Sequence, residues 1–221
     1  MKKNILSISH VSISLDSLLS ALHIDKENDL IEDIKTMLEA AIKIARPIAV
    51  YSPLSPVLCE GRIELDGVAL EEPFIYKMLS DCDIVIPYVI SCGQEIEAWS
   101  QSLTDVFEQF VADELKQMCL NAIREKLVSE VKEKYFKTEG SASHINPGSL
   151  KEWPITGQTA LFNILGGVTS DIGVRLLDSL LMSPGKSVSG ILFQTEETFH
   201  NCQLCPNIDC PSRRAPHEGN S

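Results

Sequence analysis

The spacing of apolar residues changes several times along this 221-residue chain, and this alternation limits the folds that are open to it. A helical spacing runs from residue 29 to residue 45 and ends before Pro47, and residues 48–51 then have the apolar character of a strand. The run 84–90 is apolar on both faces, which predicts a central strand, although Pro87 inside it favours a bulge or a sheet edge. Because helix and strand patterns intersperse irregularly, we predict an α+β fold and not a doubly wound parallel sheet.

The first 136 residues predict three further elements. The N-terminal residues predict a first strand, and residues 62–68 predict a short strand that runs into an Asp66-Gly67 turn. Residues 94–136 predict one long helix or two in succession, with a solvated charged end. The apolar stripe of this helical stretch is Phe107, Phe110, Val111, Leu115, Met118 and Ala122.

The C-terminal third begins with a change in composition. Residues 138–148 are rich in Gly, Ser, Asn and Pro and predict a loop. Pro154 suits the first position of a helix that Gly166-Gly167 ends. Residues 174–182 and 187–193 predict a β-hairpin around the turn formed by residues 183–186.

Charge and hydropathy narrow the function classes. The chain has 19 Lys and Arg against 31 Asp and Glu, a net charge of −12, which disfavours nucleic acid as a partner. Its longest apolar runs are far shorter than the roughly 20 residues that cross a bilayer, so no membrane partner is expected. Two lysines near the N-terminus precede a stretch that serines interrupt, which indicates a strand and not a signal peptide. We therefore expect a cytoplasmic protein.

Seven cysteines raise the question of a metal site. An odd number in such a chain does not indicate a disulfide framework, and the first four cysteines are scattered. The last three, Cys202, Cys205 and Cys210, fall within nine residues, and three thiolates at this spacing suit an iron–sulfur cluster or, alternatively, zinc. The alternative is a reduced tail that binds nothing. The candidates for a fourth ligand are Cys92, Cys82, Cys59, His200, and a water or substrate.

These patterns divide the chain into a single α+β domain over residues 1–195 and a Cys-rich metal- or cluster-binding tail over residues 196–221. The tail is polar and rich in proline, so it has few apolar residues of its own to bury.

Two stretches carry a resemblance to a known family. These stretches are residues 145–167 and residues 176–193. In residues 176–193, eight positions match, in register, a run of that family, which ends in Ser-Val-Ser-Gly and leads into an aromatic strand. The first stretch, 145–167, matches a Pro-Gly loop followed by a helix through Pro147, Gly148, Trp153, Pro154 and Gln158. The chain thereby resembles the activation (reactivation) domain of cobalamin-dependent methionine synthase, across about 50 residues. The eight positions of the second stretch are Leu176, Ser179, Met182, Pro184, Ser187, Val188, Ser189 and Gly190.

The resemblance implies helices around a twisted, mainly antiparallel sheet, and a site for S-adenosylmethionine beside a corrinoid. This chain differs from the family at three expected ligand contacts: His144 stands where the family has an arginine, and Ser149 and Leu192 each stand where it has a tyrosine. An arginine grips a carboxylate through two hydrogen bonds and a histidine does not, so these changes weigh against an unaltered S-adenosylmethionine site. The residues that the resemblance points to for cofactor binding are Glu114, His144, Asn146, Pro147, Gly148, Ser187, Ser189 and Gly190.

The leading hypothesis for function is an accessory protein that works with a corrinoid protein or methyltransferase and reaches cobalamin through that partner. Its tail would hold an iron–sulfur cluster that passes an electron. The alternatives are a non-catalytic module stapled by zinc, and a component of an S-adenosylmethionine-dependent methyltransferase with altered ligand contacts.

Overall fold

The computed structural model describes residues 2–137, 139–196, 198–210, 213 and 215–218. It has an α+β fold with a five-stranded sheet in the order β1-β2-β6-β10-β7, in which all neighbouring strands are antiparallel. The predicted fold class is confirmed. The strands of this sheet are β1 (Asn4–Ser7), β2 (Ile48–Tyr51), β6 (Val85–Ser91), β7 (Ser141–Ile145) and β10 (Ser187–Thr195).

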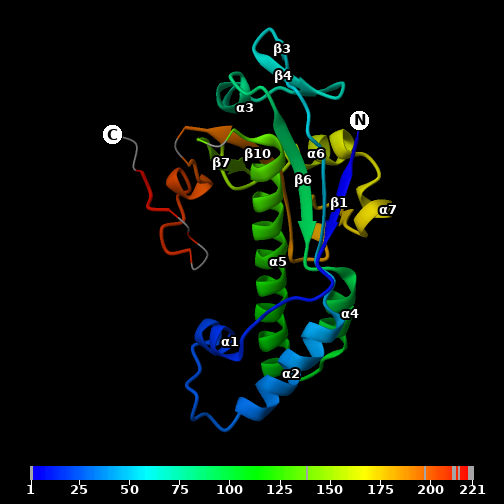
Figure 1. The fold of residues 1–221 in the computed structure, drawn as a ribbon, viewed down its shortest axis with the longest axis vertical. Coiled ribbons are helices and arrows are strands. Elements are labelled where there is room, and N and C mark those ends of the chain that lie inside the picture. Colours follow the sequence, from blue (N-terminus) through cyan, green and yellow to red (C-terminus); the bar gives the residue numbers. More distant parts are fainter. Residues whose placement is uncertain (1, 138, 197, 211–212, 214, 219–221) are drawn as a thin grey trace.

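Smaller elements surround the sheet. A three-stranded sheet projects at one end of the molecule (Figure 1), and a two-stranded ribbon precedes β10 along the chain. These strands are β3 (Val57–Cys59), β4 (Arg62–Leu65), β5 (Val68–Leu70), β8 (Arg175–Leu176) and β9 (Met182–Ser183). The helices are α1 (Leu15–Leu22), α2 (Ile31–Ile44), α3 (Pro73–Leu79), α4 (Gln94–Ser102), α5 (Val106–Tyr135), α6 (Gly157–Leu165), α7 (Val168–Ile172) and a 3₁₀ turn (Asn201–Gln203).

The long helix α5 organises the molecule, because its two halves pack against different partners (Figure 1). Asp105 caps its first turn by accepting hydrogen bonds from the backbone N–H groups of Phe107 and Glu108 at 2.9 and 3.0 Å. The first half packs with α1, α2 and α4 in a helical cluster beyond the sheet. The second half covers one face of the sheet, while α6 and α7 cover the other.

The central strand β6 explains the apolar run in the sequence. All seven of its residues are buried, since helices cover both of its faces. Pro87 favoured an edge position for this strand, but β6 lies in the middle of the five-stranded sheet. Pro87 sits opposite Ser52, just past the end of β2, where the Ser52 N–H donates to the Pro87 carbonyl at 3.1 Å. The missing N–H of proline therefore removes a ladder bond only where β2 has already ended.

Several other predicted elements are confirmed. The helix predicted over 29–45 is α2, the strand over 48–51 is β2, and the stretch 94–136 forms two helices in succession, α4 and α5. Asp66 and Gly67 both have positive φ, 48° and 80°, and they form the two-residue turn between β4 and β5.

The loop predicted over 138–148 is wrong, because β7 lies inside it. The first four residues of β7, Ser-Ala-Ser-His, are small or polar, which hides the strand pattern, and the strand is held by tertiary pairing with β10. Ile145 pairs with Ile191, and the Ser143 hydroxyl lies 2.5 Å from that of Thr195. Pairing with an apolar central strand thus overrides weak local propensity.

The hairpin predicted from 174–182 and 187–193 is also wrong. β10 pairs with β6 and β7, and β8 pairs with β9. The turn at 183–186 redirects the chain into the open position between β6 and β7. The Ser187 hydroxyl fixes this redirection by contacting the Pro184 carbonyl at 2.8 Å and the Ser91 hydroxyl at 3.0 Å.

The helix predicted to begin at Pro154 begins at Gly157. Residues 154–159 form successive hydrogen bonds between residues three apart. The Gly157 N–H donates to the Pro154 carbonyl and the Gln158 N–H to the Ile155 carbonyl, each at 3.0 Å. These are tight turns that precede the α-helix. The predicted end at Gly166-Gly167 is confirmed, since Gly167 adopts a left-handed conformation there. Among the described residues, no helix combines the length and the hydropathy that a membrane span requires.

Candidate functional site

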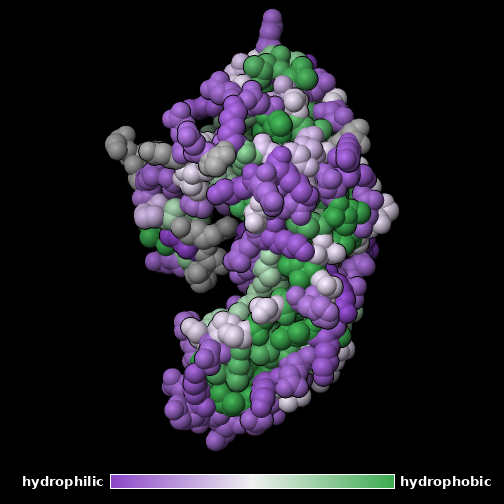
Figure 2. All heavy atoms as spheres, viewed as in Figure 1, coloured by the Kyte–Doolittle hydropathy of each residue, from purple (hydrophilic) through white to green (hydrophobic). Residues whose placement is uncertain are grey.

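A large cleft of about 1310 Å³ is lined by one side of α5 and by residues of β6, β7 and β10. Figure 2 shows the molecule hollowed between its lower helical part and the C-terminal segment. α1 supplies Ala21 and His23 to one end of the cleft, and the C-terminal segment supplies His200 and Arg213 to the other. Glu114, His144 and Ser187, three of the residues that the resemblance points to, line this cleft.

A smaller compartment of about 370 Å³ adjoins the cleft. The two share four lining residues, so they are continuous with each other. Asn146, Pro147 and Ser149 come from the loop after β7, and Ser187 and Ser189 come from the start of β10. The structure therefore brings together the two stretches that carry the resemblance. The shared residues are Arg124, Gly185, Ser187 and Val188.

The side chain of Asn146 joins the two stretches. Its Nδ2 donates to the Tyr88 hydroxyl at 2.8 Å and to the Ser189 carbonyl at 2.7 Å, and both bonds are buried. Gly190 leaves the room for this side chain, since a Cβ at Gly190 would lie 2.3 Å from the Asn146 Nδ2. Gly190 is therefore a positioning residue, and it lines neither the cleft nor the smaller compartment among the described residues.

Gly148, one of the residues that the resemblance points to for cofactor binding, uses its amide within the loop. Gly148 has a φ of +79°, and its N–H donates to the Trp153 carbonyl at 2.8 Å. This bond closes the loop on itself, so the amide is already occupied. Gly148 shapes the loop and does not line either space among the described residues.

An ion pair ties the Ser183–Lys186 turn to α5 beside the cleft. The Lys186 ammonium lies 2.9 Å from an Asp113 carboxylate oxygen. A second ion pair, between Lys116 and Glu97 at 3.2 Å with both side chains largely buried, joins α5 to α4. The Lys186 carbonyl accepts from the Cys92 N–H at 3.0 Å. The two contacts of Lys186 hold the turn, and with it Gly185 and Ser187, beside α5 and the end of β6.

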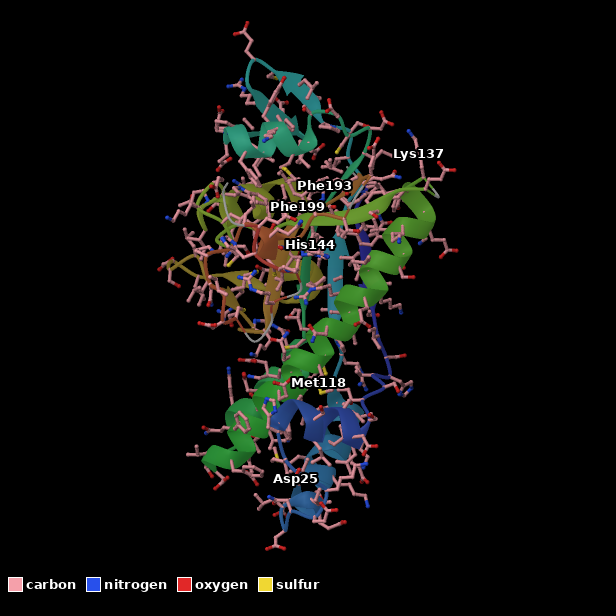
Figure 3. The ribbon with its side chains drawn as sticks, turned by 90° about the vertical axis from the view of Figure 1, so that its left-hand side faces the viewer. Asp25, Met118, Lys137, His144, Phe193 and Phe199 are labelled. Atoms are coloured by element: carbon pink, nitrogen blue, oxygen red, sulfur yellow. The ribbon has the colours of Figure 1, made fainter. Side chains whose placement is uncertain are left out.

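The C-terminal segment docks on the edge of β7. The Phe199 N–H donates to the Ser143 hydroxyl at 2.7 Å, and Phe199 packs on the sheet core. His144 and His200 form a bridge between the two segments, with ring centroids 5.6 Å apart. Figure 3 shows His144 and Phe199 beside each other, between the level of Met118 on α5 and that of Lys137, just past the end of α5. The segment thereby forms a wall of the cleft.

The tail cysteines, Cys202, Cys205 and Cys210, are half-buried thiols. Arg213 organises their loop, since its guanidinium donates to the carbonyls of Cys202 and Cys205 and of neighbouring residues. Within the part of the chain that the structure describes, no group of three His, Cys, Asp or Glu side chains is arranged to hold a metal ion.

Cys92, the first candidate for a fourth ligand, lies elsewhere in the fold. It is fully buried with Cys119 in the helical cluster formed by α1, α2, α4 and α5. Burial raises the pKa of both thiols to about 12. They are therefore protonated at neutral pH and act as small apolar side chains.

We predict that a thiol reagent distinguishes the two sets of cysteines. Native protein at pH 8 should be alkylated by iodoacetamide at the half-exposed tail cysteines, while Cys92 and Cys119 stay unmodified, because burial keeps them uncharged and inaccessible. Peptide mapping by mass spectrometry gives the readout, and the denatured protein, in which all seven react, is the control. Rapid native labelling of Cys92 would contradict this placement.

Two residues of the site escape sequence reasoning. Arg124 lines both the cleft and the smaller compartment, yet in the sequence it directly precedes the charged end of the predicted helix and carries no sign of a role. Gln158 was matched to the family but given no role, and it lies buried at the wall of the smaller compartment. No local pattern marks either residue, since only the packing of α5 and α6 against β10 places them together.

Comparison with known proteins supports the fold. No protein-family model and no curated protein matches this chain. Among solved structures, a crystal structure of the MetH reactivation domain bound to AdoHcy superposes with a TM-score of 0.61, covering 89% of this chain and 80% of that chain. The chain has the fold of the MetH reactivation domain. At 15% sequence identity, the likeness establishes the fold alone.

Proposed function

We propose that this chain binds an adenosyl amino acid, S-adenosylmethionine or S-adenosylhomocysteine, and acts with a corrinoid protein. One observation carries the proposal. The chain shares its fold with a domain whose crystal structure contains AdoHcy, and its own cleft is built from the two stretches that resemble that family. The proposed role is that of an accessory component of a corrinoid methyltransferase system.

The lining of the cleft suits such a ligand. Leu120, Val128 and Leu192 give it apolar surface on which a flat base can lie. Glu114 places a carboxylate in the same cleft, which favours the positive charge of a sulfonium or an ammonium group. His144 and His200 close the upper end. The three family contacts that differ, at His144, Ser149 and Leu192, imply that the ligand is held by an altered set of residues.

The corrinoid partner is proposed from the fold and from charge. The cleft is open enough for one side of a bound ligand to face a partner, and the net charge of −12 favours a partner with a basic patch. The chain's own residues would bind and orient the adenosyl ligand, while the corrin and its cobalt belong to the partner.

The proposal gives the tail cysteines no role as metal ligands. The described side chains give neither an iron–sulfur cluster nor zinc a set of three donors, and the segment instead contributes His200 and Arg213 to the wall of the cleft. The tail is therefore proposed to shape the ligand site.

Calorimetric titration with S-adenosylhomocysteine tests the proposal. We expect one-site binding with a Kd tighter than about 1 mM. Val188→Trp, which fills the junction of the cleft and the smaller compartment, should abolish the heat, whereas Val57→Trp on the exposed strand β3 should leave it unchanged. Absence of binding to the unmodified chain, or full binding to Val188→Trp, would refute the site. Co-elution with a cobalamin-loaded methyltransferase domain tests the partner separately.

A further inference from the structure

The C-terminal segment contains a pair of cysteines that the proposed function leaves unused. Cys202 and Cys205 are separated by two residues, and both are half-buried, so reagents in solution can reach them. Within the described part of the chain, no third His, Cys, Asp or Glu joins them in a group that could hold a metal ion. The reaction open to two accessible, neighbouring thiols is oxidation to a disulfide.

The backbone brings the two cysteines to the same side of one turn. Cys202 lies in the 3₁₀ turn Asn201–Gln203, and Leu204 follows this turn with φ −104° and ψ −7°. Gln203 and Leu204 thereby take the central positions of a type I turn, whose end residues have Cα atoms less than about 7 Å apart. Side chains three residues apart in such tight turns lie above one another. A disulfide needs Cα atoms about 4.4–6.8 Å apart, so this turn suits one.

A single side chain holds both ends of this turn. The Arg213 guanidinium donates through one terminal nitrogen to the Cys202 carbonyl and through the other, at 3.0 Å, to the Cys205 carbonyl. Because these two nitrogens belong to one planar fork, the carbonyls that they bind lie close together. This contact places Cys202 next to Cys205 independently of the backbone angles.

The same turn is connected to both spaces of the candidate site. Arg213 and His200 line the large cleft. Asn201, which precedes Cys202, is buried, and its side-chain amide lies 3.2 Å from the Asn146 Oδ1. Asn146 lines the smaller compartment. A bond that fixes the turn therefore also fixes the wall of the cleft.

We propose that Cys202 and Cys205 form a reversible disulfide by exchange with a low-molecular-weight disulfide, and that this bond fixes the wall of the cleft. The thiolate of one cysteine attacks a sulfur of the small disulfide, which gives a mixed disulfide and releases one small thiol. The thiolate of the other cysteine then attacks the protein sulfur of the mixed disulfide and releases the second small thiol. The two protein thiols thereby lose two electrons and two protons, and the small disulfide gains them. Only the effect of this bond on ligand affinity rests on the proposed function.

Equilibration with mixtures of oxidised and reduced glutathione, followed by iodoacetamide and peptide mapping, tests the disulfide. In oxidising mixtures the tryptic peptide that contains the three tail cysteines should lose the mass of two hydrogen atoms and be alkylated only at Cys210. Excess dithiothreitol should restore alkylation at Cys202 and Cys205. Cys202→Ser and Cys205→Ser should each abolish this product, whereas Cys210→Ser, the matched control in the same segment, should leave the disulfide unchanged. A disulfide that includes Cys210, or none in any mixture, would overturn the proposal.

Two further measurements test the effect on the wall of the cleft. Oxidation should slow amide hydrogen exchange over residues 199–205 by at least about 10-fold, because the crosslinked turn opens less often. It should also tighten S-adenosylhomocysteine binding by about 3- to 10-fold, since a wall that is already fixed loses less conformational freedom when the ligand binds. Neither change should appear in Cys202→Ser treated in the same way.

The outcomes separate this inference from the proposed function. If hydrogen exchange and affinity are the same in both redox states, the link between the disulfide and the cleft is refuted. If the disulfide forms and slows exchange but S-adenosylhomocysteine binds neither form, the proposed function fails and the redox pair stands. If the reduced protein binds S-adenosylhomocysteine but no disulfide joins Cys202 to Cys205, the redox pair is refuted and the proposed function stands.

Discussion

Replacing Gly190 by alanine is expected to lower the free energy of unfolding by about 3 kcal/mol and to abolish ligand binding. A Cβ at this position would lie 2.3 Å from the Asn146 Nδ2, 2.6 Å from the Ile145 carbonyl oxygen and 2.9 Å from the Tyr88 hydroxyl. Neither backbone nor ring can move far, because β7, β6 and β10 are hydrogen-bonded neighbours in the sheet.

The substitution at Gly190 would disrupt the buried hydrogen bonds of Asn146. Asn146 must give way, and its bonds to Tyr88 and to the Ser189 carbonyl are then lost inside the protein. Since Asn146 also joins the loop that lines the smaller compartment to β10, that compartment should lose its shape together with stability. Urea unfolding measures the first effect, and titration with S-adenosylhomocysteine measures the second.

Gly185 is the matched control in the same segment. A Cβ at Gly185 meets nothing within 4 Å among the described residues, and its φ is not positive. Gly185→Ala should therefore change the free energy of unfolding by no more than about 0.5 kcal/mol. If the two alanine variants were equally stable, the close packing of Asn146 over β10 would be wrong.

The elements that the sequence predicted well are those whose local pattern and tertiary role agree. α2 has a single buried face, and the apolar run of β6 follows from burial on both sides of the sheet. For α5 the sequence pattern predicts the buried residues less well, because the elements that pack against the helix change along its length. Phe110, assigned to the apolar stripe, is 54% exposed, whereas Leu127 and Val131 in the supposedly solvated end are buried on the sheet.

The candidate site shows the same limit. Motif matching found Asn146, Pro147, Ser187 and Ser189, because they lie in two contiguous stretches that also meet in space. It missed the role of Arg124, which is separated from both stretches along the chain and reaches them only because α5 lies across β10. The strand β7 was missed for a related reason, since its pairing with β10 depends on residues some 50 positions away.

The second large effect is expected at Trp153, which supports the loop of residues 146–153. Trp153 is fully buried, and its carbonyl accepts from Gly148 while its N–H donates to Leu150 at 3.3 Å. The indole lies against Gly157, where a Cβ would be 2.3 Å from Nε1. Trp153→Ala should lower the free energy of unfolding by about 3–5 kcal/mol, the usual cost of removing a large buried aromatic side chain.

Phenylalanine at the same position distinguishes lost packing from lost hydrogen bonding. The Trp153 Nε1 is buried without a hydrogen-bond partner among the described residues, so phenylalanine removes an unsatisfied donor together with part of the ring. Trp153→Phe should therefore cost only about 1 kcal/mol and retain ligand binding. Urea unfolding of both variants, with titration of S-adenosylhomocysteine under conditions where each is folded, provides the measurement. If Trp153→Phe were as damaging as Trp153→Ala, the Trp153 N–H would have a ligand or water as its partner, and the indole would belong to the binding site itself.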